Sequence, residues 1–221
     1  MSSAKAAALR PILFPSGPLP WLKPAVIVAG LVPLVKMEID LIRGTLSADP
    51  VSAGENQLGL LALVFLVASL ACTPLQTLFG WKFPIRIRKA LGLYAFFYAS
   101  LHFGVYLGFD KQLNMAEVFA DLTERPFLIV GFLAFVILVP LAVTSTAGML
   151  KRLGFKRWKA LHRLAYVAGI LGVAHFVMRV KSNLTEPVIY GTILGALFAV
   201  RLGAWLKERA RARLNRELGL D

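Results

Sequence analysis

Six apolar stretches dominate the sequence, and each is about as long as a helix that crosses a membrane. A helix needs about 20 mostly apolar residues to span the hydrocarbon core of a bilayer. The stretches are residues 19–37, 58–79, 91–109, 126–146, 160–180 and 187–206. The segments between them are too short to fold as a separate soluble domain. The sequence therefore predicts an all-α membrane protein, a bundle of six transmembrane helices forming a single domain over residues 1–221.

The first stretch carries a lysine near each end, Lys23 and Lys36. Long lysine side chains can extend to the headgroup region from such positions. The stretch also lacks the short apolar core and small-residue cleavage site that are typical of a secretory signal. We therefore expect it to be retained as the first membrane span.

Basic and acidic connecting segments alternate along the chain. Residues 80–90 and 147–159 contain lysine and arginine but no acid, whereas residues 38–57 and 110–125 are mainly acidic. Cytoplasmic loops of membrane proteins are enriched in lysine and arginine. We therefore expect the basic segments and both termini to be cytoplasmic. The net charge of +13 is then mainly a topology signal. An arginine-rich tail near membrane lipid is favoured over nucleic-acid binding.

The side chains able to hold a metal are few: three histidines and the single Cys72. One cysteine excludes an internal disulfide, a multi-cysteine zinc site and a four-cysteine iron–sulfur cluster within this chain. His102 and His175 lie well inside the third and fifth stretches, both in the outer half of the membrane. Two neutral imidazoles at similar depth can ligate one haem iron from opposite faces. Hydrogen bonding between helices is the alternative role for each of them.

His162 lies 13 residues before His175, about 20 Å nearer the cytoplasm along a helix. This depth favours a second, inner cofactor, although 13 residues place the two histidines about 140° apart around an ideal helix. Arg88 is 14 residues before His102 and faces the same way. It is a candidate to ligate an inner iron, to pair with a haem propionate, or only to set the topology. Contacts with propionates or a flavin phosphate are also open to neighbouring basic residues: Arg86, Lys89 and Arg163.

Two motifs stand at the inner ends of the third and fifth stretches. Residues 86–93 read RIRKALGL and lead to Leu101-His102, and residues 158–166 read WKALHRLAY. With Thr73-Pro74-Leu75 and Thr144-Ser145, these motifs resemble the MsrQ family, also called YedZ, of the ferric-reductase-like transmembrane group. The resemblance covers residues 55–205, and the three histidines fall on the family's histidine positions.

The resemblance implies an electron-transfer subunit rather than the catalytic subunit of an oxidoreductase system. It implies one or two haems b in the bacterial inner membrane, and FMN as a further cofactor. Electrons are expected to come from the quinone pool and to pass to an MsrP-like periplasmic molybdenum reductase, which repairs methionine sulfoxide. The wider group typically has paired histidines on both ligand helices, whereas the third stretch has only His102. The ligands of any inner haem therefore stay open.

Two other functions are open from the sequence: a small multispan permease, and a membrane scaffold without a redox role. A permease needs polar groups or broken helices near the middle of the membrane. Pro33 and Pro140 are able to break helices, but the centres of the stretches hold no obvious charged residues.

Overall fold

The computed structural model describes residues 19–180 and 183–218, which form helices and no strand. The helices are α2 (Leu22–Ile42), α3 (Pro50–Phe79), α4 (Phe83–Val105), α5 (Met115–Glu124), α6 (Pro126–Val143), α7 (Ala147–Leu153), α8 (Phe155–His162), α9 (Leu164–Arg179) and α10 (Thr185–Glu217), with a π-helical turn at Tyr106–Asp110 after α4. Five segments of the described chain are long and apolar enough to cross a membrane: Pro50–Phe79, Phe83–Asp110, Pro126–Val143, Phe155–Arg179 and Thr185–Glu217. The predicted all-helical membrane fold is confirmed at this level.

Helix α2 corresponds to the first predicted span and is 21 residues long. It is not among the five segments because it also contains charged residues: Lys23, Lys36, Glu38 and Asp40. It nevertheless packs along α4, where the Tyr98 hydroxyl donates a hydrogen bond of 2.6 Å to the Gly30 carbonyl. The count of six spans stays a prediction. The cytoplasmic placement of the termini also stays a prediction, since residues 1–18 and 219–221 lie outside the described residues.

Local sequence explains where α3 begins and ends. The Asp49 carboxylate accepts a hydrogen bond of 3.1 Å from the Ser52 backbone amide, and Pro50 occupies the first helical turn. Both features favour a helix start. At the other end, Gly80 has a φ of +70°, a left-handed conformation that suits glycine and ends the helix. Helix α3 therefore starts eight residues before the predicted stretch that begins at residue 58.

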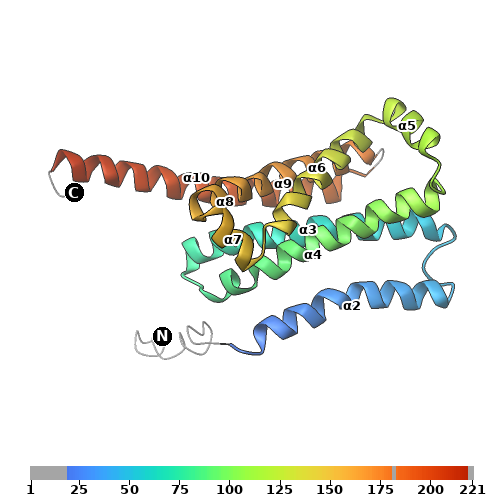
Figure 1. The fold of residues 1–221 in the computed structure, drawn as a ribbon, viewed down its shortest axis with the longest axis horizontal. Coiled ribbons are helices and arrows are strands. Elements are labelled where there is room, and N and C mark those ends of the chain that lie inside the picture. Colours follow the sequence, from blue (N-terminus) through green and yellow to red (C-terminus); the bar gives the residue numbers. More distant parts are fainter. Residues whose placement is uncertain (1–18, 181–182, 219–221) are drawn as a thin grey trace.

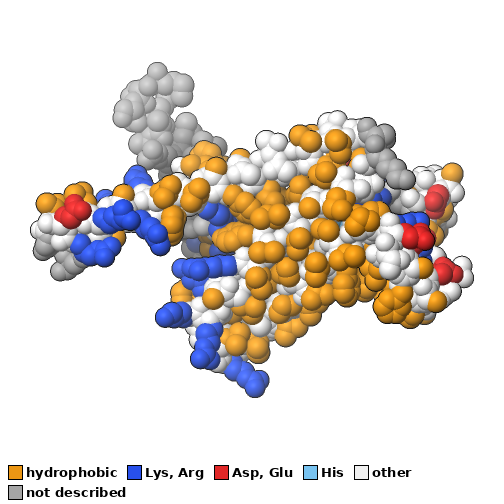
Figure 2. Space-filling view, turned by 90° about the horizontal axis from the view of Figure 1, so that it is seen from above, with side chains coloured by type: hydrophobic (Ala, Val, Ile, Leu, Met, Phe, Trp, Pro, Cys, Tyr) orange, Lys and Arg blue, Asp and Glu red, His pale blue; other side chains and the backbone are white. Residues whose placement is uncertain are grey.

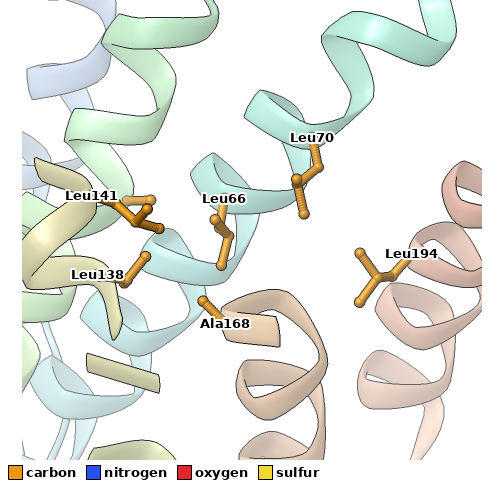
Figure 3. Packing of buried hydrophobic residues seen from close by; sticks show 7 residues of the cluster. Leu66, Leu70, Leu138, Leu141, Ala168 and Leu194 are labelled. Carbon is orange, nitrogen blue, oxygen red and sulfur yellow. The ribbon is translucent and has the colours of Figure 1, made fainter. Parts of the chain in front are cut away.

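The helices pack as an elongated bundle (Figure 1). Antiparallel α3 and α4 lie side by side, α6 packs against α9, and α10 contacts both α3 and α9. The larger buried core joins five helices at Leu66, Leu70, Ala95, Leu138, Leu141, Ala168 and Leu194. Figure 3 shows Leu66 and Leu70 of α3 directed toward α6, α9 and α10. This core separates the two ends of the bundle, where the predicted functional residues lie.

Charged side chains gather at the two ends of the bundle, and a broad apolar surface lies between them (Figure 2). Most of the visible lysine and arginine lies toward the end that carries the C-terminal part of α10, and the acids of the bundle proper lie toward the opposite end near α5. Large apolar side chains are exposed along the helices between these ends, including Ile27, Val139 and Ile170. This distribution suits a chain surrounded by lipid. Following the charge pattern, we name the α5 end of the bundle the outer end and the opposite, basic end the inner end.

Candidate functional site

His102 and His175 meet in the outer half of the bundle. The centroids of their imidazole rings are 6.2 Å apart, and the ring planes are inclined at 75°. His102 comes from α4 and His175 from α9, two helices that are not consecutive along the chain. The structure thus brings together the two histidines that the sequence analysis placed at similar depth.

Each of these imidazoles is anchored to a neighbouring helix through Nδ1. His102 Nδ1 lies 2.8 Å from the Glu55 carbonyl oxygen of α3, and His175 Nδ1 lies 2.7 Å from the Phe127 carbonyl oxygen of α6. A carbonyl only accepts hydrogen bonds, so in each ring Nδ1 carries the proton and donates. The lone pair of each neutral ring is then on Nε2. Such an outer hydrogen bond is the usual way in which proteins orient a metal-binding histidine.

Glycines on the neighbouring helices make room for both rings. A Cβ atom at Gly131 of α6 would lie 2.6 Å from His175 Nδ1, which is too close for any side chain. A Cβ atom at Gly59 of α3 would lie 3.2 Å from His102 Nδ1. Each glycine is four residues after the residue whose carbonyl anchors the ring, Glu55 or Phe127. The two histidines are therefore held by the same local arrangement on two different helices.

A cavity of about 430 Å³ adjoins the two histidines. Its walls are mainly apolar and come from α3, α4, α5, α6 and α9, with Phe103, Phe132 and Phe135 among the lining residues. Within residues 19–180 and 183–218, no group of three or more histidine, cysteine, aspartate or glutamate side chains is arranged to hold a metal ion. A metal in this cavity would therefore need most of its ligands from a bound organic group.

Helix α5 lines the outer end of this cavity and is held there by Asp121. Its carboxylate lies 2.6 Å from Lys111 Nζ and 3.7 Å from Arg125 Nε, and it accepts a hydrogen bond of 3.4 Å from the Tyr106 hydroxyl. The Lys111 contact holds the pKa of Asp121 below its ordinary value and raises the pKa of Lys111. The ion pair thus joins the turn after α4 to α5, and Val118 and Leu122 of α5 line the cavity.

Two charged residues line the cavity, Glu55 and Arg179. Arg179 is four residues after His175, so it lies on the same face of α9 one turn nearer the outer end. Glu55 Oε1 is buried and has no hydrogen-bond partner within the described chain. The outer end of an otherwise apolar cavity therefore offers one basic and one acidic side chain to a bound molecule.

The chain is similar to known membrane proteins. Residues 53–173 match the family described as ferric reductase like transmembrane component. A protein-methionine-sulfoxide reductase heme-binding subunit MsrQ from Rhodospirillum rubrum is 49% identical over 189 residues, which cover 86% of this chain and 91% of the relative. The corresponding subunits from Deinococcus radiodurans and Herminiimonas arsenicoxydans are 45% and 44% identical, covering 90% and 88% of this chain and 95% and 91% of the relatives. This chain belongs to the MsrQ family. It is a multi-pass membrane protein.

The third histidine of this MsrQ-family chain, His162, lies away from the outer cavity, near the end of α6. Its Nε2 is 3.0 Å from Thr144 Oγ1, and its ring stacks on Trp158 with centroids 4.0 Å apart. The Thr144 hydroxyl already donates to the Pro140 carbonyl at 2.6 Å, so His162 Nε2 must donate to Thr144. The lone pair of neutral His162 is then on Nδ1, unlike that of the other two histidines.

The predicted arginines occupy different surroundings near this inner end. Arg88 is exposed on α4, and its Nη1 donates a long hydrogen bond of 3.4 Å to Thr73 Oγ1. The Arg88 charge is close enough to act on the His162 imidazole. Arg86 is half-buried on α4, and exposed Arg163 lies at the turn between α8 and α9. The structure thus brings Arg88 near His162 but does not gather all three arginines around that histidine.

The sequence analysis missed Gly59, Gly131 and Arg179. The glycines are recognisable only when it is known which helix faces each histidine, which one sequence does not give. The spacing of four residues between His175 and Arg179 was an available signal, because residues four apart lie on one face of a helix.

Proposed function

We propose that this chain is the haem-binding electron-transfer subunit of a methionine-sulfoxide reductase system, in which His102 and His175 would hold the iron of a haem b. The observation that carries the proposal is the histidine pair, with both Nδ1 atoms engaged and both Nε2 atoms free to bind a metal. The names of its relatives, which call them heme-binding subunits, support the same cofactor.

The distance between the rings supports one iron between them. Two metal–imidazole bonds of about 2 Å each separate the two ligating nitrogens by about 4 Å. The remaining distance from each nitrogen to its ring centre accounts for the observed separation of 6.2 Å. A porphyrin supplies the four other ligands that the described residues do not offer. The apolar cavity walls and the phenylalanines Phe103, Phe132 and Phe135 suit its flat faces.

The residues of this chain hold and insulate the cofactor. The Glu55 and Phe127 carbonyls keep the imidazoles in the ligating tautomer, while Val118 and Leu122 of α5 add apolar wall at the outer end. When bound, the haem supplies a one-electron iron couple. Arg179 is positioned to bind the carboxylates of such a group, a role that sequence reasoning had given only to inner arginines.

The charge of Arg179 gives a prediction. We expect Arg179→Gln to lower the midpoint potential of the haem by roughly tens of millivolts, because a nearby positive charge disfavours the ferric state. A spectroelectrochemical titration of the purified protein measures this shift. Arg43→Gln is the control, since Arg43 carries the same charge in the exposed turn after α2 at the same end but does not line the cavity. An unchanged or higher potential in Arg179→Gln would contradict the assigned role.

The remaining features of the proposal concern topology and partners. We propose six spans in the bacterial inner membrane with both termini cytoplasmic, supported by the basic inner end of the bundle and by the packing of α2 on α4. The electron donor is the quinone pool, and the acceptor is an MsrP-like periplasmic reductase. FMN remains a proposed additional cofactor. The mainly apolar lining of the cavity does not favour a permease.

We also propose that His162, with Arg88, serves a cofactor on the inner half. The nearness of Arg88 to His162 supports this assignment. Ligation through His162 Nε2 would require the ring to release Thr144. Arg86 and Arg163 are then candidates for contacts with the acidic groups of that cofactor from the inner surface.

The visible spectrum of the full chain tests the central proposal. Protein expressed with sufficient haem and purified from membranes is expected to show the sharp bands of a six-coordinate b-type cytochrome after reduction with dithionite. Purified, folded protein without these bands would overturn the haem assignment and leave the scaffold as the better interpretation.

A further inference from the structure

Arg201 of α10 points into the bundle rather than toward solvent or headgroups. Its Nη2 donates a hydrogen bond of 2.6 Å to the Leu70 carbonyl of α3, and its Nη1 donates to the Tyr166 hydroxyl of α9. The guanidinium also lies 4.9 Å from the centre of the Tyr166 ring. An arginine near the end of a span usually extends to the membrane surface. Arg201 instead joins three helices inside the inner half.

Pro74 explains why the Leu70 carbonyl is free to accept this bond. In an α-helix this carbonyl would accept from the backbone amide of residue 74. Proline has no such amide, so Pro74 leaves the carbonyl without its intrahelical donor. Arg201 supplies the donor from another helix. This contact accounts for one hydrogen bond of the guanidinium but not for its charge.

The positive charge of Arg201 has no acidic partner in the described chain. The ion pairs found there involve Lys36, Lys111 and Arg125, and none includes Arg201. Arg201 Nε is buried without a hydrogen-bond acceptor. Arg88 is near enough for the two guanidinium charges to repel. A charge held in this way within a membrane protein is costly unless an anion balances it.

We propose that Arg201 and Tyr166 form a binding site for an oxyanion of a cofactor on the inner half of the bundle. The oxyanion is a carboxylate of a second haem or the phosphate of a flavin nucleotide. Both present acceptor oxygens for the Tyr166 O–H and for the N–H groups that Nη1 and Nη2 keep after their bonds to Tyr166 and Leu70. Either anion also offsets the positive charges of Arg201 and Arg88. The inference rests on the proposed function, because it takes the ligand to be an electron-carrying cofactor.

The test separates the binding role of Arg201 from its structural one. Pro74→Ala returns a backbone amide to α3, so the Leu70 carbonyl no longer depends on Arg201. In that background, Arg201→Gln removes the charge and Arg201→Lys keeps it. Arg209→Gln is the matched control, since Arg209 is exposed and stacks on Trp205 of the same helix at 3.9 Å. Full-length variants are purified, and haem and flavin per chain are measured by pyridine haemochrome and by fluorescence after extraction.

We expect Pro74→Ala/Arg201→Gln to bind the inner cofactor about ten- to a hundredfold more weakly than Pro74→Ala/Arg201→Lys. A halved haem content identifies the carboxylate, and loss of flavin with full haem identifies the phosphate. Equal haem and flavin in the two double variants would overturn the inference, as would a wild-type chain that carries one haem and no flavin. In each of these outcomes, the proposed outer haem site would still be supported if replacing His175 removed the absorption bands of the dithionite-reduced haem.

Discussion

Replacing His175 with alanine is expected to remove the haem held between α4 and α9. The imidazole provides one of the two Nε2 ligands, and the remaining residues of the cavity wall near it are mainly apolar. His102→Ala is expected to have the same effect from the other side. The loss of a metal–ligand bond should lower haem occupancy by at least about tenfold. Haem per chain and the reduced spectrum measure it.

His162→Ala is the control for this experiment, because His162 lies outside the lining of the outer cavity. It is expected to leave the outer haem spectrum unchanged. Far-UV circular dichroism of the same samples shows whether the helices are intact. We expect them to be intact, since the alanine variants remove no core residue of the five-helix cluster. If His102→Ala and His175→Ala both keep full haem content and an unchanged spectrum, the outer ligand assignment is wrong.

The sequence predicted the five helical segments that are long and apolar enough to cross a membrane, because each contains a long apolar run, which is a local property. It also placed His102 and His175 at similar depth, since depth follows from position within a run. Their mutual distance required the packing of α4 against α3 and of α6 against α9. The sequence could not give that packing, because hydrophobicity is nearly uniform around these helices.

Helices α5 and α7 and the first five residues of α8 were not predicted, since these residues were assigned to connecting segments, whereas residues 160–162 of α8 belong to the fifth predicted stretch. They are short and charged, and their boundaries depend on local signals. Asn114 accepts hydrogen bonds from the Ala116 and Glu117 amides at the start of α5, and Gly154, with a φ of +75°, separates α7 from α8. Both residues are visible in the sequence, but a search for membrane spans uses hydrophobicity and does not take account of such capping signals.

The sequence placed His162 and His175 about 140° apart around one ideal helix. The spacing assumed one regular helix, whereas α8 ends at His162 and α9 begins at Leu164. The two histidines contact opposite ends of α6, at Thr144 and Phe127. The two histidines therefore need not share one face of a helix, because each contacts α6 at a different depth. This arrangement keeps His162 apart from the outer cavity.

Gly131→Ala is expected to weaken haem binding about ten- to a hundredfold without unfolding the protein. The added Cβ would lie 2.6 Å from His175 Nδ1, so one of the two must move. Rotating the imidazole is the cheaper adjustment, because it moves a side chain rather than two packed helices. That rotation breaks the hydrogen bond to Phe127 and turns Nε2 away from its ligating direction. The change therefore affects orientation while all three histidines remain.

Two other glycines provide a graded comparison. Gly59→Ala is expected to have a smaller effect, since its Cβ would lie 3.2 Å from His102 Nδ1. A shift of the imidazole by a few tenths of an ångström is enough to relieve that contact. Gly195→Ala on α10 is the control, because its Cβ would meet no atom within 4 Å. Alanine is favoured over glycine in a helix by about 1 kcal/mol, so the helices themselves should not be weakened by any of the three changes. Haem titration of the purified apo-proteins should rank binding as Gly195→Ala strongest, then Gly59→Ala, then Gly131→Ala. Equal affinities for all three would contradict the proposal that these glycines let the imidazoles reach their carbonyl anchors.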